Sequence, residues 1–356
     1  MVTRTPFLTL TGALLLAAFL LAATVLHCPR CPAQGPSIRF GSKVPAEVDA
    51  LYERGLEYLV KTQDSSGSWE GYGNVGVTGI CLMAFLASGE DPNYGKYAPQ
   101  VRRSVRFLLA GQDDKTGYYG SSMYEHGFGL LALSEAYGVL DEAALWTGKE
   151  KPEDRIPIAK SIELGVALAV GSQKRSRLGG WRYSPDSTDS DTSVTGAVLM
   201  GLLAARNAGI EVPDECVDGA LEYFQRSTGA NGFVAYSGGL SSLGESMNRS
   251  AIATLVYAVG KKKDWEEYTN TTEHIVGKLE HNESSYPFYF RYYMAQALFQ
   301  SDYESWEKWN ALLIRKLTSL QADDGSFAGS HGNSYCTGMA MLALALNYRF
   351  LPIYER

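Results

Sequence analysis

A motif that recurs through the chain constrains its fold more than any other feature. A glutamine is followed by a short polar turn that contains glycine, and then by an aromatic residue. Successive copies lie about 50 to 60 residues apart, except for the last interval, which is nearly twice as long. Spacings of this size are typical of repeat architectures, and one copy is expected to have lost its marker. The copies begin at Gln63, Gln112, Gln173, Gln225 and Gln321.

A second series of segments indicates six repeats. After each turn comes an apolar stretch that opens with a polar residue, and Arg291 supplies the copy that the first series lacks. The opening residues are Thr78, His126, Thr195, Ser250, Arg291 and Thr337. Upstream of each lies an amphipathic stretch whose apolar residues recur at steps of three and four, as on a surface helix. These stretches are Val44–Thr62, Gln100–Ala110, Ile156–Val170, Asp214–Arg226, Trp265–Leu279 and Ser305–Leu320.

The alternation of amphipathic and apolar helices predicts an all-α fold in two concentric rings, with the apolar helices inside. A glycine or alanine follows the opening residue in most copies, which allows the inner helices to approach closely. Since six helix pairs match the number that closes a ring, we expect an (α/α)6 toroid over residues 44–356, as a single domain. An open solenoid of stacked pairs is the alternative. Closure would let distant repeats share one central hollow.

The N-terminal segment indicates export. Arg4 precedes an uncharged apolar run from Phe7 to Leu26, and a small residue, Ala33, offers a cleavage point. Residues 1–33 therefore predict a secretory signal peptide, or an N-terminal anchor that is retained, because the run is long enough to cross a bilayer. Residues 34–43 are expected to be a linker. We place the body of the protein outside the cytoplasm, near a membrane if the anchor is kept.

The charge balance excludes one class of partner. Lys and Arg total 32 against 39 Asp and Glu, a formal charge of −7. With no basic surplus to neutralise phosphates, nucleic acid is not an expected partner. The cysteines of the body, Cys81, Cys216 and Cys336, are too widely spaced for a disulfide framework or a zinc ribbon. We predict no metal and no cofactor.

The repeated turns resemble a known motif. The spacing from Gln63 to Trp69 and from Gln321 to Phe327 resembles the QW motif of squalene cyclases. Over residues 44–356 the chain resembles the prenyltransferase/squalene-oxidase repeat family, whose members include terpenoid cyclases and the β subunits of protein prenyltransferases. The resemblance implies a terpenoid cyclase-like α/α toroid and an isoprenoid or other apolar ligand. The turn aromatics are expected to lock neighbouring helix pairs together.

The catalytic patterns of that family are incomplete here. Class II cyclases protonate an alkene with an Asp of an Asp-x-Asp-Asp-Thr motif, and the nearest segment is Asp189-Ser190-Asp191-Thr192. Aligned on Thr192, it has Ser190 where the proton donor would stand, and neighbouring acids raise one another's pKa. Near the sixth inner segment only Cys336 and His331 could ligate zinc, and two ligands do not complete a tetrahedral site. Protein prenylation is therefore not expected, and whether the protein is an enzyme stays open.

Candidate site residues stand at the N-terminal ends of the predicted inner helices. Four residues before each opening position, five of the six repeats carry a residue favoured at a helix N-cap. Asp191 is therefore either a cap or a catalytic acid, with Asp189 as a ligand-binding neighbour. Ser122 and Glu125 fit a capping box. The six residues at this position are Asn74, Ser122, Asp191, Ser246, Pro287 and Asn333.

Further candidates depart from their repeat or share an equivalent position. His126 and Arg291 replace the hydroxyl residue that opens the other apolar stretches. We take His126 as a second candidate catalytic residue and Arg291 as a candidate ligand-binding residue, although each also has a structural interpretation. Converging inner-helix N-termini favour an anionic or electron-rich ligand. Tyrosine faces near them could hold an isoprenoid chain or stack on a sugar ring. The tyrosines concerned are Tyr124, Tyr289 and Tyr335.

Three functions remain open at this stage. The first is binding of an isoprenoid or other apolar ligand at the mouth formed by the inner-helix N-termini, with a divergent cyclase or transferase activity as an extension. The second is a non-catalytic interaction or scaffold module that binds a protein partner of the cell envelope. The third is a polysaccharide-processing enzyme, by analogy with other α/α barrels.

Overall fold

The computed structural model describes residues 44–70, 74–146, 148, 155–238, 244–348 and 351–354, and Ser42–Arg356 forms one compact unit. Over the described ranges, apolar inner helices alternate along the chain with amphipathic outer helices. The inner helices are α3 (Asn74–Leu86), α5 (Met123–Tyr137), α8 (Thr192–Asn207), α10 (Met247–Val259), α12 (Pro287–Ser301) and α14 (Asn333–Leu344). The outer helices are α2 (Ala46–Thr62), α4 (Ala98–Ala110), α7 (Ile158–Gln173), α9 (Asp214–Ser227), α11 (Glu266–Val276) and α13 (Tyr303–Leu320).

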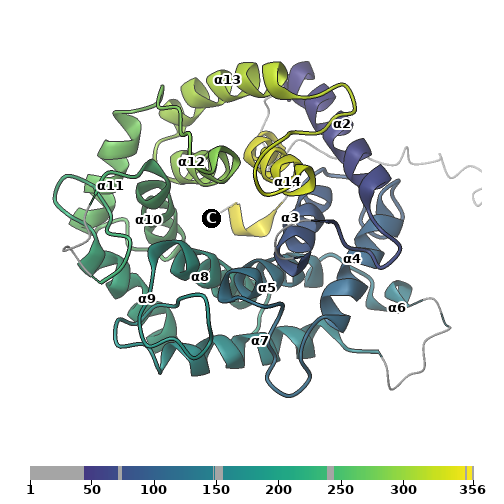
Figure 1. Cartoon of the computed structure of the whole chain (residues 1–356), viewed down its shortest axis with the longest axis horizontal. Helices are drawn as coiled ribbons and strands as arrows, with labels where there is room; N and C mark the ends of the chain where they lie inside the picture. The colour runs from purple at the N-terminus through teal and green to yellow at the C-terminus, as the bar shows by residue number, and fades with distance from the viewer. Residues whose placement is uncertain are drawn as a thin grey trace, which may run out of the picture. The chain divides into compact units, whose positions relative to one another are not determined.

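The two sets of helices form closed concentric rings. Each inner helix packs against the inner helix of the next repeat, and α14 packs against α3, so the last repeat meets the first. In the outer ring, α13 likewise contacts α2. Figure 1 shows the inner helices surrounded by outer helices, several of which run along the circumference. The predicted (α/α)6 toroid is confirmed, and the open solenoid is excluded.

The turn glutamines join neighbouring repeats. The side-chain amide of Gln63 donates to the Gly67 carbonyl in its own turn (3.0 Å) and to the Gln100 carbonyl of the next outer helix (3.1 Å). Gln112 and Gln173 repeat this arrangement with the helices that follow them. Gln321 donates to Gly325 (3.0 Å) and, across the ring closure, to Leu51 of α2 (2.9 Å). We call these bonds the glutamine clamp.

The aromatic residues of the turns are held by their own repeat. The indole N–H groups of Trp69 and Trp181 donate to carbonyls of α2 and α7. The backbone N–H of Trp181 donates to Thr195 Oγ1 (3.0 Å), and that of Phe327 donates to Thr337 Oγ1 (3.0 Å). Thr195 and Thr337 therefore hold the turn of their own repeat, and the locking of neighbouring helix pairs by the aromatics stays a prediction.

The N-cap prediction is confirmed at three of the five positions for which it was made. The side chains of Ser122, Asp191 and Ser246 accept hydrogen bonds from backbone amides in the first turns of α5, α8 and α10. At the sixth repeat the prediction was wrong, because Asn333 is already helical and Gly332 is the N-cap. In the fifth repeat the cap is Tyr286, which has a left-handed backbone and no side-chain capping bond.

Aromatic side chains cross the centre of the inner ring. Two inner helices separate α5 from α12 in either direction around the ring, so these two helices face one another. The rings of Phe128 (α5) and Tyr292 (α12) nevertheless lie 6.4 Å apart, and both side chains are buried. The expected hollow is therefore bridged at this level, because bulky aromatics from opposite helices reach the axis.

The end of the chain also enters the ring. The short helix η4 (Pro352–Tyr354) contacts α8, and the side chains of Leu351 and Ile353 are buried. In Figure 1 this segment is drawn inside the circle of inner helices. The last described residues therefore pack against the inner ring.

The targeting prediction concerns other residues. No helix within the described ranges is both long enough and apolar enough to span a bilayer. The predicted signal or anchor (residues 1–33) and the linker (34–43) lie outside the described residues.

The turn glycines provide a test of how closely the repeats pack. Gly67 has φ +98°, and a Cβ there would collide with the Arg103 carbonyl of α4. We expect Gly67→Ala to lower the free energy of unfolding by about 2 kcal/mol or more. Gly138, the C-cap of α5, has φ −75° and open space around it. Gly138→Ala should change stability by less than about 1 kcal/mol. Urea unfolding compares the two, and equal effects would contradict the packing described.

Candidate functional site

Four of the predicted site residues meet at the mouth of the inner ring. Tyr124 and Tyr289 begin α5 and α12, and their rings lie 6.0 Å apart across the ring. Tyr335 in the first turn of α14 interacts electrostatically with both. Asp191, the N-cap of α8, is close enough to Tyr289 for its charge to raise the pKa of that hydroxyl. We call Asp191, Tyr124, Tyr289 and Tyr335 the mouth cluster.

Asp191 caps α8 with one of its two carboxylate oxygens and leaves the other without a hydrogen bond. Its Oδ1 accepts a hydrogen bond from the Val194 amide (2.9 Å), as an N-cap does. Its Oδ2 is buried and has no hydrogen-bond partner. Burial raises the pKa of Asp191 to about 6, against the opposing influence of the Val194 amide and the Arg182 guanidinium. The structural and functional interpretations of Asp191 are thus compatible, because the two oxygens differ.

Tyr289 places a second unsatisfied group beside Asp191. Its side chain is buried, and no hydrogen bond of good geometry reaches its hydroxyl, although other hydroxyls lie nearby. Burial raises its pKa to about 12, while the nearby hydroxyls of Tyr124, Tyr293 and Ser193 act in the opposite direction. The hydroxyl is therefore protonated near neutral pH and can donate a hydrogen bond. A donor and an acceptor without partners lie together in aromatic surroundings.

A polar and aromatic rim surrounds this cluster on the α8 side. Asp189 does not face the buried cluster; it forms an ion pair with Arg182 and is about half exposed. Tyr183, 53% exposed, shares a hydrogen bond with Tyr236 through their hydroxyl groups (3.2 Å). The charge of Asp191 contributes to the raised pKa of Tyr183. Sequence reasoning missed Arg182, Tyr183 and Tyr236, because they lie in turns between helices and share no repeat-equivalent position.

His126 has a structural role. The residue is completely buried, its Nδ1 accepts the backbone N–H of Tyr119 (3.2 Å), and its Nε2 lies 3.0 Å from the Gly165 carbonyl of α7. The first bond is the one that Thr195 and Thr337 make in their repeats. Burial lowers the pKa of His126 to about 4, so the ring is neutral. Because both ring nitrogens already have partners, we no longer consider His126 a candidate catalytic residue.

Arg291 lies apart from the mouth cluster, between α12 and α14. Its guanidinium stands over the Phe288 ring at 5.0 Å and interacts with the Cys336 thiol. Only 8% of the residue is exposed, and its Nη1 has no hydrogen-bond partner. The aromatic packing predicted for Arg291 is therefore present, but its charge is not balanced there.

The zinc prediction considered only Cys336 and His331, and it overlooked one sequence in which a single residue separates Asp from Cys. Asp214-Glu215-Cys216 opens the outer helix α9, where Asp214 pairs with Arg206 (3.0 Å) and Cys216 is buried. No group of three or more His, Cys, Asp or Glu side chains that could hold a metal ion occurs among the described residues. The Asp-x-Cys of this chain is thus part of an outer helix and does not contribute to the mouth.

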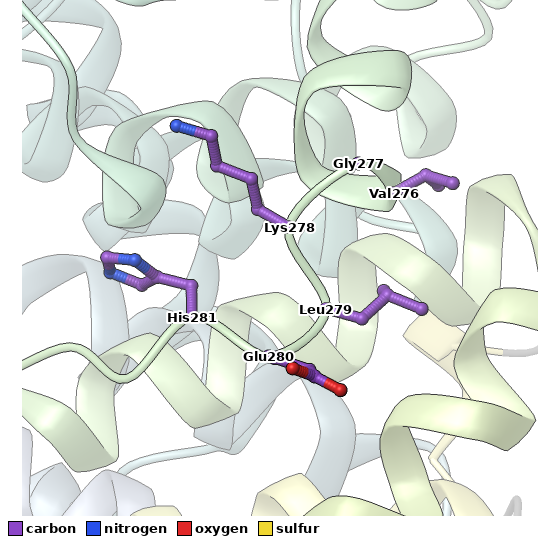
Figure 2. Close-up of a pocket in the computed structure, with 6 residues that line it drawn as sticks. All are labelled: Val276, Gly277, Lys278, Leu279, Glu280 and His281. Atoms are coloured by element: carbon purple, nitrogen blue, oxygen red, sulfur yellow. The ribbon is translucent and has the colours of Figure 1, made fainter.

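A surface pocket of about 470 Å³ lies elsewhere, where the chain leaves α11. It is lined by the consecutive residues 276–281. Figure 2 shows Lys278 and His281 extending to one side of this segment, with Leu279 and Glu280 toward the other. Lys278 pairs with Glu245, and none of the predicted site residues lines the pocket. Because binding sites usually gather polar groups from several elements, the mouth is the better candidate.

The unpartnered oxygen of Asp191 has a consequence for stability. Since its folded-state pKa lies above the unfolded value, the folded protein binds more protons between about pH 4 and pH 6, and loses stability as the pH rises through this window. Asp191→Asn keeps the cap and removes the charge. We expect the variant to be more stable than the wild type by about 1–3 kcal/mol at pH 7–8, with the difference vanishing near pH 4.

Urea unfolding at several pH values measures this difference. The titration of His126 also affects stability, but it does so equally in both proteins and cancels when their free energies of unfolding are subtracted. Ser246→Asn, at the cap of α10, is the matched control, and it should show no pH-dependent difference from the wild type. A stability difference that is constant with pH for Asp191→Asn would contradict the raised pKa.

Comparisons with known proteins identify the fold. No protein-family model matches the sequence, and no curated protein matches it. The type II terpene cyclase MstE from Scytonema, in complex with its substrate geranylgeranyl dihydroxybenzoate, is similar in structure with a TM-score of 0.57 and 13% identity, over 86% of this chain and 98% of the cyclase. The GH76A alpha-1,6-mannanase from Salegentibacter sp. HEL1_6 gives a TM-score of 0.61 and 10% identity, over 84% and 99%. At these identities the chain shares the α/α toroid fold with a terpene cyclase and with a mannanase.

Proposed function

We propose that the protein binds a small amphipathic molecule at the mouth cluster, with an isoprenoid body and a hydroxyl-bearing head. One observation carries this proposal: Asp191 Oδ2 and the Tyr289 hydroxyl are both buried without a hydrogen-bond partner, and they are close enough for the Asp191 charge to raise the pKa of Tyr289. Buried polar groups are normally paired, because leaving one unpaired costs about 1–3 kcal/mol. A ligand hydroxyl that donates to Asp191 and accepts from Tyr289 would satisfy both.

The surroundings of these two groups favour an apolar body on the ligand. The rings of Tyr124, Tyr289 and Tyr293 form a continuous aromatic surface, with centroids 4.7–6.0 Å apart. Such faces pack well against branched hydrocarbon. The similar terpene cyclase holds an isoprenoid substrate, which supports this class of ligand.

The residues argue for binding without cyclisation. Ser190, at the position of the missing acid, lies 2.8 Å from Ser176 Oγ and accepts from the Gly180 amide (3.1 Å). Its hydroxyl is thus part of a turn, and Asp191 has no second buried carboxyl beside it. An acid with a pKa of about 6 is too weak to protonate an alkene without such help. The bridged centre also leaves little depth for folding a polyene.

Binding of an oligosaccharide is a second candidate. Two tyrosines near the mouth are unusually exposed, Tyr183 at 53% and Tyr286 at 55%. Exposed rings of this kind can stack on sugars, and a shallow site accepts a chain that passes over the surface. The similar mannanase is consistent with this use of the fold.

A thermal-shift experiment separates these proposals. We expect polyprenols and shorter isoprenoid alcohols to raise the melting temperature of the wild type by several degrees at saturation. Tyr289→Phe removes only the unpaired hydroxyl, so it should fold normally and lose most of the shift. Tyr257→Phe, whose hydroxyl bonds to Thr228 Oγ1 (2.9 Å) away from the mouth, is the matched control. It should be destabilised but keep the full shift.

The alternative outcomes are distinct. A shift with oligosaccharides alone would favour the second candidate. No shift across either panel, or equal shifts in the two variants, would count against a ligand at the mouth and leave a non-catalytic platform as the remaining function.

A further inference from the structure

Arg291 is a buried cation without a counter-ion. More than nine-tenths of its surface is covered, and Nη1 is buried without a hydrogen-bond partner. Among the described residues no carboxylate forms an ion pair with Arg291, and no hydrogen bond to its guanidinium is seen. Its contacts are the Phe288 ring and the Cys336 thiol. Burial lowers the pKa of Arg291, but arginine does not deprotonate in proteins, so the charge remains.

The neighbours of Arg291 do not offset the cost of this burial. A cation–π contact with one phenylalanine recovers less than burying an unpaired guanidinium costs. Burial raises the pKa of Cys336 to about 11, so the thiol is neutral near pH 7. The ring of His331 lies 5.4 Å from that of Tyr335. Because a histidine side chain is either neutral or positively charged, it brings no negative charge either.

The N-terminus of α14 adds a second electropositive group at the same place. Cys336, which interacts with Arg291, lies in the first turn of this helix. The N-cap is Gly332, and no side chain caps the first-turn amides, unlike those of α5, α8 and α10. The backbone amide of His331 also acts on the Cys336 sulfur. An uncapped helix N-terminus attracts anions through its free N–H groups and its dipole.

The covering segment is thin. Gly329 is exposed, and a Cβ at this position would lie against Cys336 and the edge of the Phe288 ring. Gly329 therefore lies between solvent and the two side chains that Arg291 contacts.

We propose that Arg291 and the N-terminus of α14 form a binding site for a small oxyanion, a phosphate or carboxylate group. The planar fork of the guanidinium matches two oxygens of such a group, and the first-turn amides of α14 supply further donors. The anion balances the buried charge and caps the helix at once. This site adjoins the mouth cluster, since Tyr335 also lies in the first turn of α14, but it does not depend on the function proposed for that cluster.

The test uses the purified protein and inorganic phosphate as the probe, with acetate and chloride as the other arms. Titration calorimetry is expected to show one phosphate per chain, and the melting temperature should rise saturably by several degrees. Arg291→Met should abolish the phosphate-dependent rise. In buffer without oxyanions this variant should melt above the wild type, because it no longer buries an unpaired charge. Acetate should act like phosphate, only more weakly, if a carboxylate is the natural group, and chloride should have little effect.

Two further variants keep the result interpretable. Arg291→Lys retains the charge but not the fork, so phosphate should bind about tenfold or more weakly. Arg249→Met is the matched control, since Arg249 is half-buried and its Nε and Nη2 donate to the Val234 and Gly244 carbonyls. It should lose stability and keep the phosphate response. A phosphate response that survives Arg291→Met, or a wild type that responds to none of the oxyanions, would overturn the proposal.

Discussion

The glutamine clamp is the interaction on which the rest of the structure depends. One side-chain amide bonds at once to its own turn and to the next outer helix, so it fixes the angle between successive repeats. The clamp is present at Gln63, Gln112, Gln173 and Gln321, and Gln321 joins the last repeat to α2 of the first. Ring closure, in turn, brings the first turns of α5, α8, α12 and α14 to one mouth. The mouth cluster would not exist in an open array, because Tyr124 and Tyr289 come from opposite sides of the ring.

Inside this ring, buried polar groups fall into two kinds. His126, Ser190, Thr195 and Thr337 bond to the backbone of the turns and hold them in place. Asp191 Oδ2, the Tyr289 hydroxyl and Arg291 Nη1 are equally buried and bond to nothing. The first kind stabilises the fold, whereas the second lowers its stability unless a ligand is bound. We therefore assign the candidate functions to the second kind.

Much of the fold was predictable because the repeat period records it directly. In each clamped turn a glutamine makes the clamp, a glycine adopts the positive φ and an aromatic side chain is buried, so these residues recur with the repeat. The helix periodicity predicts which helices form the inner and the outer ring. The meeting of Tyr124, Tyr289 and Tyr335 followed from their equivalent positions once closure was assumed. His126 was misread because its departure from threonine looked like specialisation. A ring nitrogen accepts the same backbone bond as a hydroxyl, so the departure preserved the structural role.

The features that the sequence did not reveal depend on side-chain reach and on contacts outside the repeat. Phe128 and Tyr292 bridge the ring because both are long enough to meet at the axis, which periodicity does not report. The rim tyrosines Tyr183 and Tyr236 come from turns whose lengths differ between repeats. That Arg291 has no counter-ion is likewise visible only when every neighbour is placed. All three depend on how side chains from different repeats meet, and that is a property of the assembled ring.

The central claim is that closure leaves an unpaired acid in the mouth, and the titration of that acid tests it most directly. Carboxyl ¹³C NMR, with Asp191→Asn used to assign the resonance, measures its midpoint. The account predicts a midpoint near pH 6, which should move when a ligand hydroxyl binds. A midpoint near pH 4, the ordinary value for aspartate, would mean that Asp191 is solvated or already paired, and would contradict the account.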